Sequence, residues 1–91
     1  MTLVCYQISV KGRVQGVFYR ASAKAKALDL GVKGWVTNES DGSVLIEAEG
    51  TKDKIIDLID WCKAGPKHAR VDEVRKEEVG VKHYKGFEIR H

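Results

Sequence analysis

The sequence is poor in proline and cysteine: its 91 residues include one proline, Pro66, and two cysteines, Cys5 and Cys62. No apolar run approaches the ~20 residues of a membrane-spanning helix, and no hydrophobic segment follows a basic start as in a secretory signal. Two distant cysteines make neither a metal site nor a disulfide framework by themselves. We therefore expect reduced structural thiols, a cytoplasmic location and no membrane partner.

Motifs for metals and for enzymatic nucleophiles are missing as well. The three histidines, His68, His83 and His91, lie in the C-terminal part, and no two share a predicted helix at ligand spacing. No serine or cysteine stands beside a histidine, and the Gly-Lys-Ser/Thr of a Walker loop is absent. These absences predict no metal site and no cofactor, with the histidines as solvated surface residues.

What the chain does have is an uneven distribution of charge. Residues 1–35 contain six cations and one anion, a net charge of +5, whereas the whole chain carries +3. A basic N-terminal third suggests an anionic partner, either nucleic acid or a small phosphate or carboxylate. Length and composition fit one domain over residues 1–91, since no linker, repeat or low-complexity tract interrupts the chain.

Alternating and helical patterns predict the elements. Val4, Tyr6, Ile8 and Val10 alternate with polar residues, which indicates a half-buried strand with Cys5 on its opposite face. An Asp-Gly pair between two apolar runs predicts a hairpin. The further strands are expected at 33–38, 43–49, 69–79 and 86–90, and the helices at 18–30, ended by Gly31, and between a capping Thr51 and Gly65-Pro66.

Each predicted helix has an apolar side. In the first helix the residues at helical spacing are Ala21, Ala25 and Leu28. In the second they are Ile55, Leu58, Ile59 and Cys62. The order strand-helix-strand-strand-helix-strand, with a short last strand, predicts an α+β fold of the ferredoxin-like βαββαβ type: an antiparallel sheet with two helices on one face. The two thiols would then lie on opposite sides of the sheet, too far apart to pair.

The segment Gly12-Arg13-Val14-Gln15-Gly16-Val17-Phe18-Tyr19-Arg20 leaves a strand, turns on glycine and enters a helix. Backbone N–H groups at a helix start lack intrahelical partners and lie at the positive end of the helix dipole. Such a loop suits an anion, and Gly16 lets the backbone fold closely around a phosphate. Arg20 could hold two phosphate oxygens with its planar fork.

Asn38 is the remaining candidate for chemistry. It ends the strand before the Asp-Gly turn and alternates onto the same face as Val36, the face that the helices should cover. Since Arg20 begins one of those helices, the two side chains could converge. By residue type alone, an asparagine at this place is more often a simple turn residue.

A set of motifs spread over the whole chain points to one family. The motifs are the loop 12–20, Gly34-Trp35-Val36-Thr37-Asn38, Asp41-Gly42, Gly50, Trp61, Gly65-Pro66, Ala69-Arg70-Val71 and Gly86-Phe87-Glu88-Ile89-Arg90. In these positions the chain resembles the acylphosphatase family. The resemblance implies the same ferredoxin-like fold and the hydrolysis of the carboxyl–phosphate bond of acyl phosphates without metal or cofactor.

The resemblance also implies roles for particular residues. Arg20 matches the essential arginine of the family, and Asn38 matches its water-positioning asparagine. The phosphate-binding loop matches Gln15, Gly16, Val17, Phe18 and Tyr19. Tyr19 stands where many members have phenylalanine, and we expect its extra hydroxyl to face solvent. His91 stands where many members end in an aromatic residue, which leaves the anchoring of this end open.

Together these inferences predict an acylphosphatase that acts on a small acyl phosphate, releases inorganic phosphate and works as a monomer. The alternative is a non-catalytic anion- or RNA-binding module of the same topology. An RNA-recognition sheet needs aromatic residues on its open face. The third strand offers Leu45, Glu47 and Glu49 there, so no nucleic-acid partner is expected.

Overall fold

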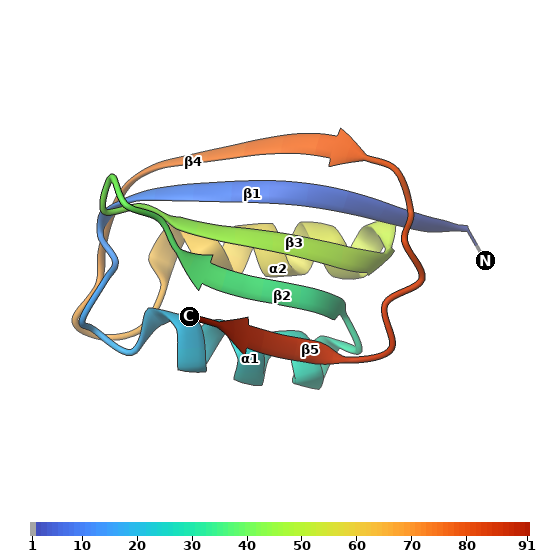
Figure 1. The fold of residues 1–91 in the computed structure, drawn as a ribbon, viewed down its shortest axis with the longest axis horizontal. Helices are drawn as coiled ribbons and strands as arrows, with labels where there is room; N and C mark the ends of the chain where they lie inside the picture. Colours follow the sequence, from blue (N-terminus) through green and yellow to red (C-terminus); the bar gives the residue numbers. More distant parts are fainter. Residues whose placement is uncertain (1) are drawn as a thin grey trace.

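The computed structural model describes residues 2–91. Its elements follow in the order β1 (Leu3–Arg13), α1 (Tyr19–Leu30), β2 (Lys33–Asn38), β3 (Val44–Thr51), α2 (Lys52–Ala64), β4 (Arg70–Val79) and β5 (Phe87–Arg90). The predicted element order is confirmed. Both helices cover the same face of the sheet (Figure 1).

The five strands lie in the order β4-β1-β3-β2-β5. Three of the four pairings are antiparallel, but β2 and β5 run parallel. The predicted antiparallel sheet with two helices on one face is confirmed, and the parallel pair lies at one edge of it. The reason is the connection 80–86, which returns the chain to the end of the sheet where β2 begins; the Gly34 N–H donates to the Gly86 carbonyl there (2.9 Å).

One end of the sheet gathers segments that are distant in sequence. Strands β1, β2 and β5 all finish at this end, and α1 begins there (left in Figure 1). The loop after β1, the β2–β3 turn and the last residues of the chain are thereby neighbours. In the turn, the Asp41 carboxylate accepts from the Ser43 N–H (2.9 Å) and hydroxyl (2.6 Å), while Gly42 takes a φ of 93°. The predicted Asp-Gly hairpin is confirmed.

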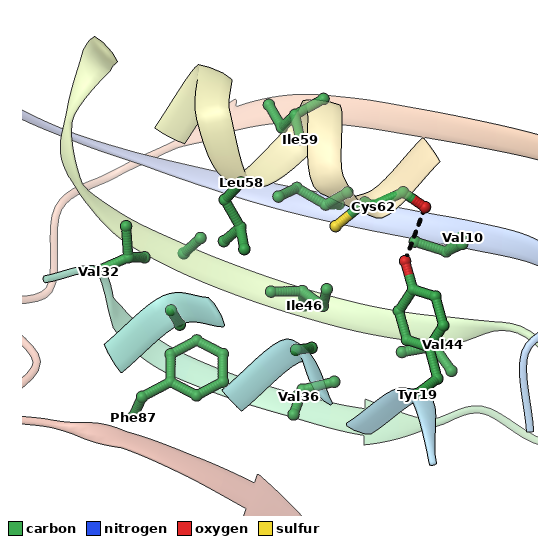
Figure 2. Close-up of a cluster of buried hydrophobic side chains, with 14 of the residues drawn as sticks. Val10, Tyr19, Val32, Val36, Val44, Ile46, Leu58, Ile59, Cys62 and Phe87 are labelled. Carbon is green, nitrogen blue, oxygen red and sulfur yellow. Dashed lines mark hydrogen bonds between the residues drawn. The ribbon is translucent and has the colours of Figure 1, made fainter. Parts of the chain in front are cut away.

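The core lies between the helices and the sheet (Figure 2). The predicted α2 stripe is confirmed, since all four of its residues are at most 5 % exposed. A fully buried leucine or isoleucine contributes roughly 1.5–3 kcal/mol relative to an exposed one. At the start of α2, Thr51 occupies the cap position, but its hydroxyl donates to the Asp53 carboxylate (2.6 Å) and does not bond the helix backbone.

The buried face of α1 differs from the prediction. Tyr19, Ala23 and Ala27 are buried. Ala21, Ala25 and Leu28 point outward instead. Both sets fit the helical period, and alanine is too small to mark the inner face by itself. The decisive residue is Tyr19, whose ring packs against Trp61 with 5.4 Å between ring centroids.

The expectation that the Tyr19 hydroxyl faces solvent was wrong. The side chain is 1 % exposed, and the hydroxyl donates to the Cys62 carbonyl of α2 (2.9 Å; Figure 2). Burial raises the pKa of this phenol, so it stays protonated. Gly65, at a φ of 68°, leaves room for the ring, since a β-carbon there would lie 2.7 Å from it. Tyr19 therefore joins the two helices.

The face away from the helices is covered at one end by the connection 80–86. Glu49 accepts three successive backbone N–H groups there, from Lys82 (2.7 Å), His83 (3.0 Å) and Tyr84 (2.9 Å). Burial alone would raise the pKa of Glu49, but these three hydrogen bonds outweigh it and lower the pKa. Glu49 thus fastens the connection to the sheet as an ionised group.

Glu47 makes a second attachment beside the first. It accepts from Gln7 (2.9 Å) and from the Tyr84 hydroxyl, and Lys82 forms an ion pair with it (3.1 Å). Burial opposes ionisation, yet these partners lower the pKa of Glu47. Two carboxylates, each at most 3 % exposed, are therefore fully paired beneath the connection.

The thiols lie on opposite sides of the sheet, as predicted. Cys62 belongs to the helix-side core, while Cys5 faces the connection and is unexpectedly buried too. Burial raises the pKa of Cys5 to about 11 and that of Cys62 to about 12. Within residues 2–91, neither helix has the length and apolar character needed to cross a membrane.

Candidate active site

The loop between β1 and α1 is fixed by two inward-facing valines. Val14 is 1 % exposed and Val17 is 7 % exposed, so both ends of the loop are held in the core. Between and after them, Gly16 and Phe18 adopt left-handed conformations, with φ of 73° and 63°. The backbone therefore turns tightly before it enters α1.

The side chain of Gln15 ties this loop to the β2–β3 turn. Its amide nitrogen donates to the Glu39 carbonyl (2.8 Å) and to the Ser43 carbonyl (2.9 Å). Both amide N–H groups are thereby engaged by backbone acceptors. The side chain of Gln15 is used for structure, which leaves its backbone N–H as the group that could contact a ligand.

A cavity of about 280 Å³ opens at this end of the sheet, and it brings together Arg20 and Asn38. Of the predicted loop residues, Gly16, Phe18 and Tyr19 line it, whereas Gln15 and Val17 do not. Its full lining is Val14, Gly16, Phe18, Tyr19, Arg20, Ala21, Asn38, Ile89 and His91. No aspartate or glutamate side chain is among these residues, so the cavity suits an anion.

Asn38 is the last residue of β2 and shares the helix-side face with Val36, which is fully buried. In the part of the chain that the structure describes, the Asn38 Oδ1 is buried and receives no hydrogen bond from any protein group. A buried acceptor without a partner costs roughly 1–3 kcal/mol. A bound molecule that donates a hydrogen bond to this oxygen is thus favoured.

Arg20 lies in the first turn of α1, and its donors divide into two groups. Its Nη1 donates to the Arg90 carbonyl (3.1 Å) and contacts the His91 Nδ1 (3.2 Å). Within residues 2–91, no protein acceptor engages its Nε or Nη2. One edge of the guanidinium is held by the end of β5, and another edge is available to bind two oxygens of an anion.

The contribution of β5 and the residue after it was not predicted from the sequence. Ile89 and His91 line the cavity, and His91, although exposed as predicted for the histidines, contacts Arg20. The motif that ends at Arg90 could have indicated that the end of β5 lies at the site. Using it would have required knowing that β5 pairs parallel to β2. That pairing places Arg90 opposite Thr37, next to Asn38.

Metal ligands do not gather in the region that the structure covers: among residues 2–91, no three His, Cys, Asp or Glu side chains come together as a cation site. The cavity is lined by one permanent cation, Arg20, with the loop backbone beside it. The helix start adds N–H groups and the positive end of the α1 dipole. This arrangement can bind a small phosphorylated anion.

Comparison with known proteins agrees with a site for a small phosphorylated anion. The acylphosphatase family model matches residues 6–89. The chain belongs to the acylphosphatase family. An acylphosphatase from Marinobacter nauticus is 48 % identical over 79 residues, which covers 87 % of this chain and 86 % of that protein. One from Aeropyrum pernix is 49 % identical over 92 residues, covering 99 % and 91 %.

The fold agrees equally well. The structure of an acylphosphatase from Coxiella burnetii has a TM-score of 0.94 and 42 % identity, covering 97 % of this chain and 93 % of that one. A full-length HypF has a TM-score of 0.92 and 35 % identity, covering 99 % of this chain but 12 % of that one. The ferredoxin-like fold and the acylphosphatase, that is hydrolase, activity of this chain follow from such relatives.

Proposed function

We propose that Arg20 and the loop amides bind the phosphoryl group of an acyl phosphate while Asn38 holds the attacking water. The observation that carries this proposal is the unpartnered Asn38 Oδ1, which belongs to the same cavity as the free edge of Arg20. The Asn38 oxygen lacks a donor, which a water can supply. The open edge of Arg20 lacks an acceptor, which a phosphate can supply.

The reaction follows from this placement. The water oxygen forms a bond to phosphorus in line with the breaking bond between phosphorus and the acyl oxygen, and the carboxylate leaves with the electron pair. Acyl phosphates are already activated, because a carboxylate is a good leaving group. Positioning and charge stabilisation then supply the acceleration. A phosphoryl oxygen of the substrate takes the proton of the water.

We further propose that the reaction needs no metal or cofactor and that residues 1–91 act as one catalytic domain, monomeric and cytoplasmic. The absence of aspartate and glutamate side chains from the cavity lining supports the first point. The RNA-binding alternative finds little support, since Glu47 and Glu49 are acidic and lie beneath the connection 80–86.

The test compares Asn38→Ala with Thr37→Val, a change on the neighbouring residue of β2 whose side chain is on the other face. Removing one preorganised donor or positioning group typically costs ~10²–10³ in rate. We expect a loss of that size in kcat for benzoyl phosphate in Asn38→Ala, and near-parent activity in Thr37→Val. Parent activity in a folded Asn38→Ala protein, or inhibition by a chelator, contradicts the mechanism.

A further inference from the structure

Phe18 is an aromatic residue that the fold itself does not need. Its side chain is 81 % exposed, the largest value among the large exposed hydrophobic residues that the structure describes. An exposed ring gains almost none of the free energy that burial gives an aromatic residue. The stabilisation of the fold therefore does not account for a phenylalanine at this position.

The backbone makes this residue type still less expected. Phe18 has φ 63° and ψ 24°, the left-handed region, and it caps α1 with its carbonyl accepting from the Ser22 N–H (3.0 Å). Glycine or asparagine takes this conformation most readily, whereas a bulky side chain is strained there. The turn needs the backbone of residue 18 but not its ring.

Phe18 nevertheless lines the cavity that holds Arg20 and Asn38. Apolar atoms there come from Phe18 together with Ala21, which is exposed, and Ile89, which is half-buried. Because Phe18 lines the cavity and is also 81 % exposed, it belongs to the open mouth of the cavity. Phe18, Ala21 and Ile89 form what we call the apolar lip, and a ligand that reaches the loop between β1 and α1 passes it.

The direction of the leaving group connects this lip with the substrate, and this step rests on the proposed function. The attacking water is held at the Asn38 Oδ1, which is buried. In-line displacement places the leaving group opposite the attacking water. The acyl group accordingly points from the buried end of the cavity toward its exposed mouth.

We propose that the Phe18 ring contacts the acyl group and selects acyl phosphates whose acyl part is aromatic or bulky and apolar. The substrate class is the mixed anhydride of phosphoric acid with such a carboxylic acid, in preference to acetyl or carbamoyl phosphate. The small acyl groups leave the ring in water, whereas a phenyl group covers its face. Phe18 thus sets specificity, in addition to the contribution of its backbone to the loop.

The experiment measures the ratio of kcat/KM for benzoyl phosphate to kcat/KM for acetyl phosphate. An aromatic contact of this kind corresponds to roughly a 2–10-fold effect. We expect Phe18→Ala to lower the ratio by that factor, and Phe18→Tyr to keep it. Alanine retains the β-carbon and hence the backbone constraint at residue 18. The matched control is Leu28→Ala, because Leu28 is a 59 % exposed residue of the same helix that does not line the cavity.

A binding measurement separates specificity from turnover. Phenylphosphonate and methylphosphonate are tested as competitive inhibitors beside inorganic phosphate, and Phe18→Ala should weaken phenylphosphonate selectively. An unchanged ratio, or an equal loss for both substrates and both phosphonates, overturns the proposal. Failure of the water-positioning mechanism is seen separately, as full activity in Asn38→Ala, whatever the ratio in Phe18→Ala.

Discussion

At the scale of single residues, the proposed function gives Arg20 two tasks, each carried by different atoms. Its Nη1 is held by the Arg90 carbonyl and contacts His91, and its other edge is open to the cavity. A guanidinium can do both because its donors are fixed in a plane. A lysine ammonium at the same place keeps the charge but cannot present a fork to phosphate while bonded to the end of β5.

Arg20→Lys should therefore behave almost like a loss of function. We expect kcat/KM for benzoyl phosphate to fall by about 10²–10³, with weaker inhibition by inorganic phosphate. The control is Arg13→Lys, since Arg13 is an exposed arginine that precedes the same loop but does not line the cavity. Retention of activity in Arg20→Lys would mean that two-point binding by the guanidinium is wrong.

Tyr19 is the second residue whose role depends on one hydrogen bond. Tyr19→Phe leaves the buried Cys62 carbonyl without its donor, which should lower the free energy of unfolding by about 1–2 kcal/mol. Urea unfolding measures this loss, with Tyr6→Phe on β1 as the control. Activity under native conditions should stay close to the parent, because the hydroxyl is bonded to the carbonyl of Cys62, a residue that does not line the cavity. A strong loss of kcat without loss of stability contradicts this assignment.

At the scale of elements, the loop between β1 and α1 and the β2–β3 hairpin are joined by Gln15. Its side chain bridges to two carbonyls of the turn region, those of Glu39 and Ser43. The hairpin also carries Asn38 at the end of β2. The distance between the loop amides and Asn38 is therefore set partly by this one amide group.

Gln15→Leu should loosen the link between the β1–α1 loop and the hairpin that carries Asn38. We expect a loss of about 1 kcal/mol in stability from the two unmade hydrogen bonds and about a tenfold loss in kcat from the less well fixed geometry. Gln15→Glu offers no donor and should be at least as harmful. Kinetics and urea unfolding of both variants test this, and unchanged kcat in both would show that the loop holds its shape alone.

The helices show where sequence patterns succeed and where they do not. For α2 the stripe of large aliphatic residues around Leu58 identified the buried face correctly, because such side chains are costly to expose. For α1 the alanines at 21 and 25 gave the wrong face, since alanine is tolerated on either side. Burial of Tyr19 determines which face of α1 packs on the sheet. The sequence alone does not show which group the tyrosine hydroxyl will bond.

At the scale of the whole molecule, local patterns predicted each element and the convergence of Arg20 with Asn38. They did not predict what the connection 80–86 does. It covers Cys5 on the far face, and it returns the chain so that β5 pairs parallel to β2. Both effects depend on contacts between residues more than thirty positions apart, such as those of Glu49 with residues 82–84.

The attachment of this connection should make stability depend on acid. The pKa values of Glu47 and Glu49 lie below the ordinary 4.5 in the folded state. Their contribution is thus fully present above about pH 4.5 and is lost as pH falls through the lowered values. We expect the free energy of unfolding to decline below pH 4.5 more steeply in the parent than in Glu47→Gln.

The matched comparison is Glu77→Gln, an exposed change on the edge strand β4. It should leave the acid slope of the parent unchanged. Urea titrations at a series of pH values, followed by circular dichroism, give the slopes. Equal slopes for the parent and Glu47→Gln would contradict the role assigned to the buried carboxylate.

Because the two thiols are buried in different places, their modification rates can report on two different opening motions of the protein. Cys5 is closed off by the connection 80–86 and Cys62 by the packing of α2 on the sheet. A thiol-modifying reagent added in pulses should therefore reach Cys5 whenever the connection alone lifts from the sheet, and Cys62 only when the helical layer separates. Two modification rates, read by mass spectrometry of peptides from one sample, would distinguish a local opening from global unfolding without any introduced probe.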